Sequence, residues 1–144
     1  MFVRKQGKTK FMYFPVTVST AISKGAVVAL ASGQIIPALN DVATYSVVGV
    51  IRHAIAATDD DYATARNVEV EVPVEKNVVW TADVNAGTLA TTSVGSYFDF
   101  TTDDDGSGFD QDVSTLDHVL CTKFISTSKG EVVLNIGADS HTKA

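Results

Sequence analysis

The sequence predicts an all-β protein: a single compact β-sandwich or small β-barrel-like domain with an extended N-terminal arm. Short runs of β-branched and aromatic residues recur along its 144 residues, and most of them end at glycine, proline or a small polar turn. Helical periodicity is nearly absent, and the best helical candidate is one or two turns over residues 59–67 capped by Asp59. Short strands separated by turns in this way are typical of sandwiches and barrels.

The first expected strands lie near the N-terminus. Residues 11–19 are aromatic and β-branched, and Pro15 marks a sheet edge or the start of strand pairing. Residues 26–31 and 34–39 are apolar and flank Ser32-Gly33, which has the composition of a two-residue hairpin turn. This part of the sequence therefore predicts a strand followed by a β-hairpin.

The next two strands carry the clearest patterns. Residues 46–56 are apolar with Gly49 inside, which predicts a bulge or a close approach of another backbone. In residues 67–75 four valines alternate with polar residues, a period of two that predicts a half-buried antiparallel strand with an acidic, wet face. Proline on that face places the strand near a sheet edge. The polar positions are Glu69, Glu71, Pro73 and Glu75.

The C-terminal half continues the strand pattern. We expect residues 67–84 to form an antiparallel pair, and Ser128-Lys129-Gly130 to turn the chain between the last two strands. The later strands are expected over 77–84, 96–101, 117–126 and 131–136. The side chains expected to be buried here are Val70, Val72, Trp80 and Phe124.

Basic residues are concentrated at the start of the chain. The first ten positions hold four of the eleven basic residues, so the remaining 134 carry seven basic and seventeen acidic side chains. We expect a basic arm over residues 1–10, disordered in the isolated subunit, then a β domain over 11–137 and a C-terminal tail over 138–144. An acidic body lacks the clustered Lys and Arg that bind phosphates, so no direct nucleic-acid partner is expected. The residues expected to contact a neighbouring subunit are Phe2, Arg4, Lys5, Lys8, Lys10 and Phe11.

One loop partly fits the pattern of a calcium-binding loop. Three candidate ligands fall at positions 1, 3 and 5, Gly108 takes the place of the sharp turn, and Phe109 offers a backbone carbonyl. The twelfth position is Ser114, where the motif needs a bidentate Glu. An acidic, glycine-rich surface turn is therefore the favoured interpretation, with an ion site as the alternative, and no cofactor is expected. The candidate ligands are Asp103, Asp105 and Ser107.

The other candidates for chemistry each have a simple structural explanation. The acidic run at 59–61 fits a solvated loop, and the glutamates of 67–75 fit an exposed strand face. The three histidines are far apart, and the single cysteine, Cys121, lies in an apolar run and is expected to be buried. Trp80 is expected to anchor the core rather than stack on a ligand. No hydrolase, metalloprotease, P-loop or paired-cysteine motif occurs, so the sequence does not predict an enzyme.

Two blocks of the sequence carry a family resemblance. The first is SKGAVVALASGQIIPAL at 23–39, followed after a short connection by YSVVGVIRHAI at 45–55. The second contains VGSYFDF at 94–100, the DDDGSGFD loop, DHVLCTKFIS and KGEVVLNI. In this order, over residues 11–137, the blocks resemble a tailed-bacteriophage head decoration (capsid cement) protein. The second block looks like the closing sheet of these small capsid-binding domains.

The resemblance implies an all-β structural virion protein that binds the outer capsid surface and stabilises the expanded shell against genome pressure. Its implied partner is the major capsid protein, often with a homo-oligomer such as a trimer around a lattice symmetry axis. The implied location is the outer surface of a virion made in the host cytoplasm, and the N-terminal arm is a common means of attachment. No membrane partner is expected, because no segment approaches the ~18 apolar residues that span a bilayer.

Two other classes of protein remain open. One is another virion β-domain, from the tail or neck, for which long exposed hairpins in a polymerising ring would be the favouring feature. The other is a calcium- or carbohydrate-binding β-sandwich, for which a closed site at residues 103–112 would be the favouring feature.

Overall fold

The computed structural model describes residues 1–39, 41–101 and 107–135, and in these ranges the chain consists of strands, turns and two 3₁₀ turns. No α-helix occurs within them, and no helix there is long and apolar enough to cross a membrane. The all-β fold class is therefore confirmed. The helical turns expected over 59–67 are irregular turns instead, and Asp59 accepts the backbone N–H of Ala56 at 3.0 Å. The 3₁₀ turns are η1 (Thr44–Ser46) and η2 (Thr91–Ser93).

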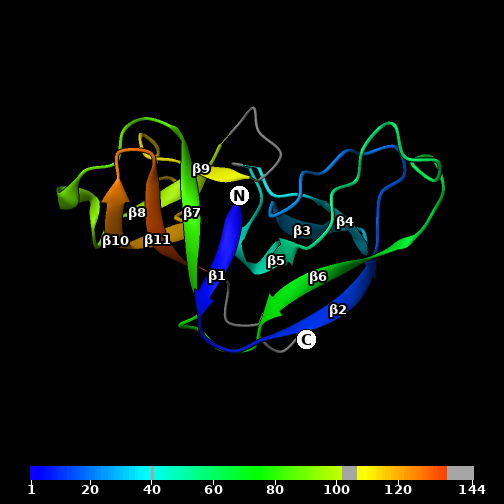
Figure 1. Cartoon of the computed structure of the whole chain (residues 1–144), viewed down its shortest axis with the longest axis horizontal. Coiled ribbons are helices and arrows are strands. Elements are labelled where there is room, and N and C mark those ends of the chain that lie inside the picture. Colours follow the sequence, from blue (N-terminus) through cyan, green and yellow to red (C-terminus); the bar gives the residue numbers. More distant parts are fainter. Residues whose placement is uncertain (40, 102–106, 136–144) are drawn as a thin grey trace.

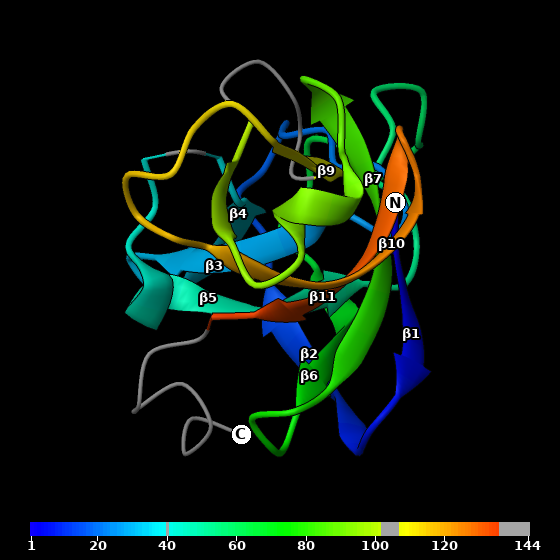
Figure 2. The ribbon, with the colours of Figure 1, turned by 90° about the vertical axis from the view of Figure 1, so that its left-hand side faces the viewer.

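Six strands form the first sheet, and five of them close into a ring (Figure 1). The sheet order is β1-β7-β11-β10-β8-β9, and β9 also pairs with β7 in parallel, which joins the ends of the ring. Figure 2 views the molecule from the end at which the ring lies. The strands are β1 (Phe2–Gln6), β7 (Val79–Ala86), β8 (Tyr97–Phe100), β9 (Gly108–Asp110), β10 (Val119–Ser126) and β11 (Lys129–Leu134).

Five strands form the second sheet, in the order β2-β6-β5-β3-β4 and all antiparallel. Just after β2, Val16 forms a parallel bridge with Ile35 of β4, so the sheet curls back toward itself. The curl is incomplete, because β2 and β4 do not pair along their lengths. The strands are β2 (Thr9–Pro15), β3 (Val27–Ala31), β4 (Gln34–Pro37), β5 (Val47–Ile51) and β6 (Asn67–Pro73).

Two apolar clusters hold these sheets together. The larger fills the ring and extends across to the facing side of the second sheet, where Val27 and Val50 join it. The smaller is aliphatic and lies inside the curl of the second sheet, where Val70 and Val72 join it. Val70, Val72 and Trp80 are buried as expected, whereas Phe124 is only half-buried. Cys121 is buried as expected, and burial raises the pKa of its thiol.

Turn and glycine positions follow the sequence closely. Ser32 and Gly33 both have positive φ, 51° and 79°, as a primed two-residue hairpin turn between β3 and β4 requires. At Gly49 the β3–β5 register shifts, and a Cβ atom there would collide with the carbonyl oxygen of Glu71 on β6. Both expectations for Gly49, a bulge and a close backbone approach, are therefore confirmed.

The N-terminal segment is not a free arm, which corrects the expectation for residues 1–10. Phe2–Gln6 forms β1 and pairs antiparallel with β7, with Phe2 opposite Ala82. The Phe2 side chain is only 2% exposed and contacts the Phe100 ring edge to face. Residues 9 and 10 already belong to β2, so this segment joins the two sheets (Figure 1). The tail expected over 138–144 lies outside the described residues.

The pairing expected over residues 67–84 is also wrong. β6 pairs with β2 and β5, whereas β7 pairs with β1, β11 and β9, so the two neighbours in sequence belong to different sheets. Pro73 ends β6 beyond the two residues that pair with β5. At Pro73 the only neighbouring strand is therefore β2, as expected for a sheet edge. β6 as a whole is not an edge strand, because it lies between β2 and β5. The last turn lies at residues 127–128, because Lys129 and Gly130 already belong to β11.

Candidate functional site

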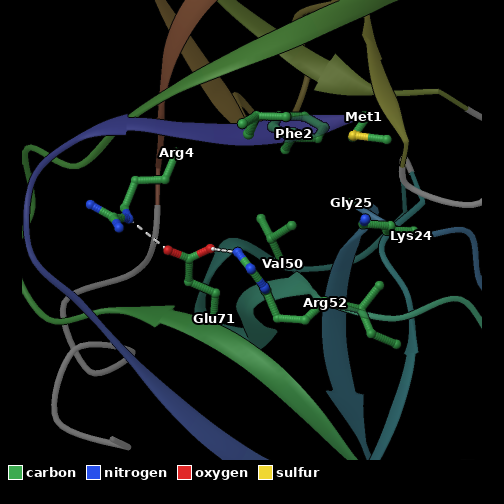
Figure 3. Close-up of a pocket in the computed structure, with 10 residues that line it drawn as sticks. Met1, Phe2, Arg4, Lys24, Gly25, Val50, Arg52 and Glu71 are labelled. Atoms are coloured by element: carbon green, nitrogen blue, oxygen red, sulfur yellow. Dashed lines mark hydrogen bonds and ion pairs between the residues drawn. The ribbon is translucent and has the colours of Figure 1, made fainter.

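A hollow of about 240 Å³ lies where β1 of the first sheet passes over β5 and β6 of the second (Figure 3). Its apolar wall includes Phe2, which belongs to the ring core, and Val50 from β5. Its polar lining comes from one carboxylate and several cationic side chains. These polar residues are Arg4, Lys24, Arg52 and Glu71.

Glu71 is the centre of this hollow and is only 1% exposed. Its carboxylate accepts hydrogen bonds from Arg4 Nε at 2.7 Å and from Arg52 Nη1 at 2.9 Å. The hydroxyl of Thr9 donates a third, at 2.8 Å. A buried carboxylate needs such partners, because an unpaired buried charge is strongly unfavourable. The acidic face expected on β6 is therefore not uniformly wet, and Glu71 connects β1 to the second sheet.

The charges around the hollow do not cancel. Arg4 and Arg52 flank a single carboxylate, and their side chains are both about half exposed. The guanidinium of Arg52 also lies over the ring of Phe11, with its Cζ 5.3 Å from the ring centroid. This geometry is a cation–π contact, which holds Arg52 at the surface with its remaining N–H groups in place. The arrangement can attract an anionic group, and carboxylate or phosphate oxygens suit a guanidinium best.

The surface continues from Phe11 along β2. Phe11 and Tyr13 are on the same side of the strand and are 51% and 66% exposed. The hydroxyl of Tyr13 donates to Glu69 Oε2 at 3.2 Å, and this hydrogen bond is the main reason that the pKa of Tyr13 is raised. Two exposed aromatic rings beside a guanidinium are the residue types that carry most of the energy at protein interfaces.

A second hollow, of about 330 Å³, lies beyond Tyr13. Arg66 pairs there with Asp61 and Asp59, and both carboxylates raise the pKa of its guanidinium. The backbone N–H of Ala56 and then Arg66 lower the pKa of Asp59. The polar and aromatic lining residues are Tyr13, His53, Asp61, Arg66, Asn67 and Glu69.

The six residues expected to make contacts fall into two groups of three. Phe2 is buried, Arg4 is paired with Glu71, and Lys5 lies 3.4 Å from Glu131. The expectation of an exposed contact residue is therefore wrong for Phe2. Arg4 and Lys5 form ion pairs within the molecule, yet their side chains are 43% and 53% exposed, so for them contact with another subunit stays a prediction. The other three are exposed along the start of β2, and within the described residues the two lysines make no ion pair. They are Lys8, Lys10 and Phe11.

The calcium-loop interpretation is not supported by its described part. Gly108 and Phe109 lie in β9 rather than in a sharp turn, and Phe109 is fully buried in the ring. The hydroxyl of Ser107 accepts a hydrogen bond from Asn85 Nδ2 at 3.1 Å. Asp103 and Asp105 lie outside the described residues. Elsewhere in the described ranges no group of three or more His, Cys, Asp or Glu side chains converges on a metal position.

Sequence reasoning missed a buried polar pair in the ring. His118 stacks on Phe100 with ring centroids 4.4 Å apart, donates from Nε2 to the carbonyl of Val42 at 2.7 Å, and accepts the N–H of Phe100 at Nδ1. Asp99 of β8 accepts backbone N–H groups from the loop that precedes β10. The donors are Thr115, Leu116 and Asp117. These bonds tie the loop before β10 to β8 of the ring and to the loop that holds Val42, which indicates a structural role.

Tyr13 and Arg52 were also missed as surface residues. The signal for Tyr13 was present, because Phe11 and Tyr13 are two positions apart in a strand and must share a face. No local pattern marked Arg52, whose position over Phe11 depends on β5 and β2 lying on either side of β6.

Comparison with models of known families, with curated proteins and with solved structures finds no match to this chain. The function proposed for it therefore rests on the geometry of the site and on the resemblance seen in its sequence.

Proposed function

We propose that this protein is a structural virion component that binds the outer surface of a bacteriophage capsid and stabilises the expanded shell. The observation that carries the proposal is the β2 edge, which we define as the exposed side chains of Lys8, Lys10, Phe11 and Tyr13 together with the open side of strand β2. The edge presents aromatic and basic groups on a chain whose formal net charge is −6. Aromatic and basic side chains that are grouped on one surface of an acidic protein suit attachment to another protein surface.

The body of the molecule supports the same role. A ring of paired strands has few free edges. The bonds of Glu71 to Arg4 and Arg52, which we call the Glu71 seam, tie β1 of the first sheet to the second sheet. A domain held by long-range strand pairing transmits force between the surfaces that it joins, as a protein that braces a shell must do. The N-terminal residues would act as two folded strands, β1 and β2, one in each sheet, rather than as a loose arm.

The partners follow from the same proposal. The major capsid protein would supply the surface that receives the β2 edge, and the protein would sit on the outside of the virion. A homo-oligomer, for example a trimer at a lattice symmetry axis, would place several such edges on neighbouring coat subunits and raise the avidity of attachment.

Binding to capsids tests this proposal directly. Purified protein is mixed with expanded and with unexpanded shells of the virus that encodes it, and occupancy is measured by co-sedimentation and by cryo-electron microscopy. The protein should occupy the outer surface of expanded shells and raise the temperature at which they release DNA. Binding confined to tails or necks would contradict the proposal in favour of another virion role.

A pair of matched variants tests the surface used. Phe11→Ser/Tyr13→Ser removes the exposed aromatics of the β2 edge and should weaken capsid binding by about tenfold or more, because aromatic anchors dominate interfaces. Val94→Ser/Tyr97→Ser removes side chains that are 45% and 41% exposed near and on β8 of the ring, and should bind as the unaltered protein does. Equal binding by the two double variants would mean that the β2 edge is not the contact surface.

The second hollow favours one other candidate function, the binding of a saccharide. An exposed ring at Tyr13, next to Asp61 and Asn67, offers a stacking platform with hydrogen-bonding groups beside it. Saturation-transfer NMR with host cell-wall oligosaccharides tests this function, and Tyr13→Ala should abolish any transfer. Capsid binding by the unaltered protein, with no saturation transfer from the oligosaccharides to it, would leave the capsid role alone.

A further inference from the structure

The outer side of β2 is the longest open sheet edge in the part of the chain that the structure describes. β2 pairs with β6 on one side and is the terminal strand of its sheet. The opposite terminal strand, β4, has four residues, ends at Pro37 and is bridged by Val16. On β1, the N–H of Phe2 is already bonded to the carbonyl of Gly25 at 2.7 Å. A seven-residue strand therefore remains open between Thr9 and Pro15.

The register of β2 shows which backbone groups face outward. The carbonyl of Lys8 accepts the N–H of Val74 at 3.1 Å, and the N–H of Val16 donates to the carbonyl of Arg66 at 3.0 Å. Hydrogen-bonded pairs in an antiparallel ladder alternate with pairs that are not bonded. The even-numbered residues from 8 to 16 therefore bond to β6, and the odd-numbered ones point their N–H and C=O groups away from it. The outward donors belong to Thr9, Phe11 and Tyr13.

Pro15 marks where this edge stops. It is an odd-numbered residue, so the N–H that it lacks would have pointed outward rather than toward β6. Proline is tolerated there for that reason, and it blocks pairing beyond Tyr13. The usable edge thus runs from Thr9 to Tyr13, where the N–H and C=O groups of alternate residues face away from β6 and no described strand pairs with them.

The side chains along this edge specify what could pair with it. On one face Phe11 and Tyr13 are exposed, and Arg52 lies over Phe11. At the start of the strand Lys8 and Lys10 are exposed with no ion pair to the described residues, on the opposite face. A strand laid along β2 would place apolar side chains beside the aromatic rings and acidic side chains beside the lysines.

We infer that the β2 edge is a strand-addition site for an extended segment of another protein that alternates apolar with acidic residues. Main-chain hydrogen bonds to Thr9, Phe11 and Tyr13 give the affinity, and the alternating side chains give the specificity. A second copy of this chain fits less well, because its own β2 would bring the same lysines toward Lys8 and Lys10. The inference deepens the proposed function by naming the kind of segment that a coat protein would offer.

Synthetic peptides test the inference without any capsid. The probes are a capped octapeptide that alternates Val and Glu and a matched one that alternates Val and Lys, each titrated into the full chain. Amide hydrogen exchange is followed residue by residue by NMR. The Val/Glu peptide should slow exchange at Phe11 and Tyr13 by about tenfold or more, leave Lys10 and Met12 nearly unchanged, and bind more weakly as salt rises. The Val/Lys peptide should do none of this.

Two variants separate the backbone from the charges. Phe11→Pro removes the central outward N–H together with the Phe11 ring but no bond to β6, so the fold should persist while peptide affinity falls about tenfold or more, and further than in Phe11→Ser, which removes the ring alone. Lys8→Gln/Lys10→Gln should reduce affinity about threefold to tenfold. The matched control, Lys123→Gln/Lys129→Gln, removes the same charge from β10 and β11 and should bind as before. If Phe11→Pro does not fold, the lysine variants still decide the question.

Each alternative outcome contradicts the inference in a distinct way. Unchanged exchange at Phe11 and Tyr13 with millimolar Val/Glu peptide would show that the edge does not accept a strand. A dimer seen by sedimentation, lost in Phe11→Pro and strengthened by salt, would show that a second copy occupies the edge. Failure of capsid binding together with intact peptide binding would remove the proposed function and leave the strand-addition site.

Discussion

The ring β7-β11-β10-β8-β9 and the five-stranded sheet differ in the side chains of their cores and in the pairing of their edge strands. The ring buries large aromatic side chains, including Trp80, Phe100 and Phe109, and each of its strands has a neighbour on both sides. The second sheet encloses an aliphatic core of valine and isoleucine and leaves β2 unpaired along its outer side. Closure removes the edges at which proteins associate, whereas an open sheet keeps one available.

The comparison suggests a division of roles between the two regions. In the proposed function the ring supports the molecule, and the open sheet carries the surface that binds the partner. The two are not independent, because Val27 and Val50 of the open sheet belong to the same apolar cluster as the ring, and Glu71 joins β1 to β5 and β6. Four experiments, ordered from the largest expected effect to the smallest, test how far this division holds.

Val72→Asp should unfold the whole molecule and not the open sheet alone. Val72 is 2% exposed, and an unpaired charge there costs several kcal/mol against a total stability of about 5–15 kcal/mol. Since the two regions share a core cluster, NMR spectra should lose dispersion for ring residues as well. Val3→Asp, at a position that is 52% exposed, is the control and should fold normally. A dispersed ring spectrum in Val72→Asp would show that the ring folds by itself.

Loss of the indole at the centre of the ring should be costly, and loss of one methyl group from the open sheet should be mild. Trp80→Ala removes the largest side chain of the ring core and should lower the free energy of unfolding by about 3–5 kcal/mol. Ile35→Val trims the aliphatic core of the open sheet and should lower it by about 0.5–1.5 kcal/mol. Urea titrations followed by circular dichroism measure both values. A loss for Trp80→Ala as small as that for Ile35→Val would show that the ring relaxes around the missing indole and is loosely packed.

Glu71→Gln tests the seam between the two regions. The amide keeps the shape of the side chain but leaves two guanidiniums without their carboxylate, which should cost about 1–3 kcal/mol. Glu69→Gln is the matched control from the same face of β6, where the side chain is partly exposed, and should cost less than about 1 kcal/mol. Equal costs at the two positions would show that the buried cluster does not stabilise the junction.

Asp59→Asn should produce the smallest change, and the change should depend on pH. The Ala56 N–H and Arg66 lower the pKa of Asp59 in the folded protein, so its carboxylate stabilises the fold above the ordinary Asp pKa of about 3.9. That contribution is lost as pH falls through the lower folded value. Melting temperatures of the native and Asn proteins should therefore differ near neutral pH and converge as the pH falls below the lowered pKa of Asp59. A melting-temperature difference that stays the same at all pH values would show that it does not come from the titration of Asp59.

Much of the fold was predictable because its signals are local. The Ser32-Gly33 turn, the bulge at Gly49 and the burial of Val70 and Val72 all follow from residue types a few positions apart. Glu71 is the instructive failure. Its place in a strict alternation predicted a wet face, and that face is wet at Glu69 but covered at Glu71, where β1 and Arg52 close over the carboxylate.

The sequence by itself determined that this chain forms strands, where most of them lie and which residues of each are apolar, because a period of two is a local property of the pleat. Only the tertiary structure decided which strands are neighbours. β6 and β7 follow each other in sequence yet join different sheets, β1 enters the ring in place of a free arm, and β9 closes that ring in parallel with β7. Strand pairing depends on contacts between distant segments, whose stability comes from the shared core and not from the pattern of either strand. For the same reason the open edge of β2 could not be seen until its neighbours were known.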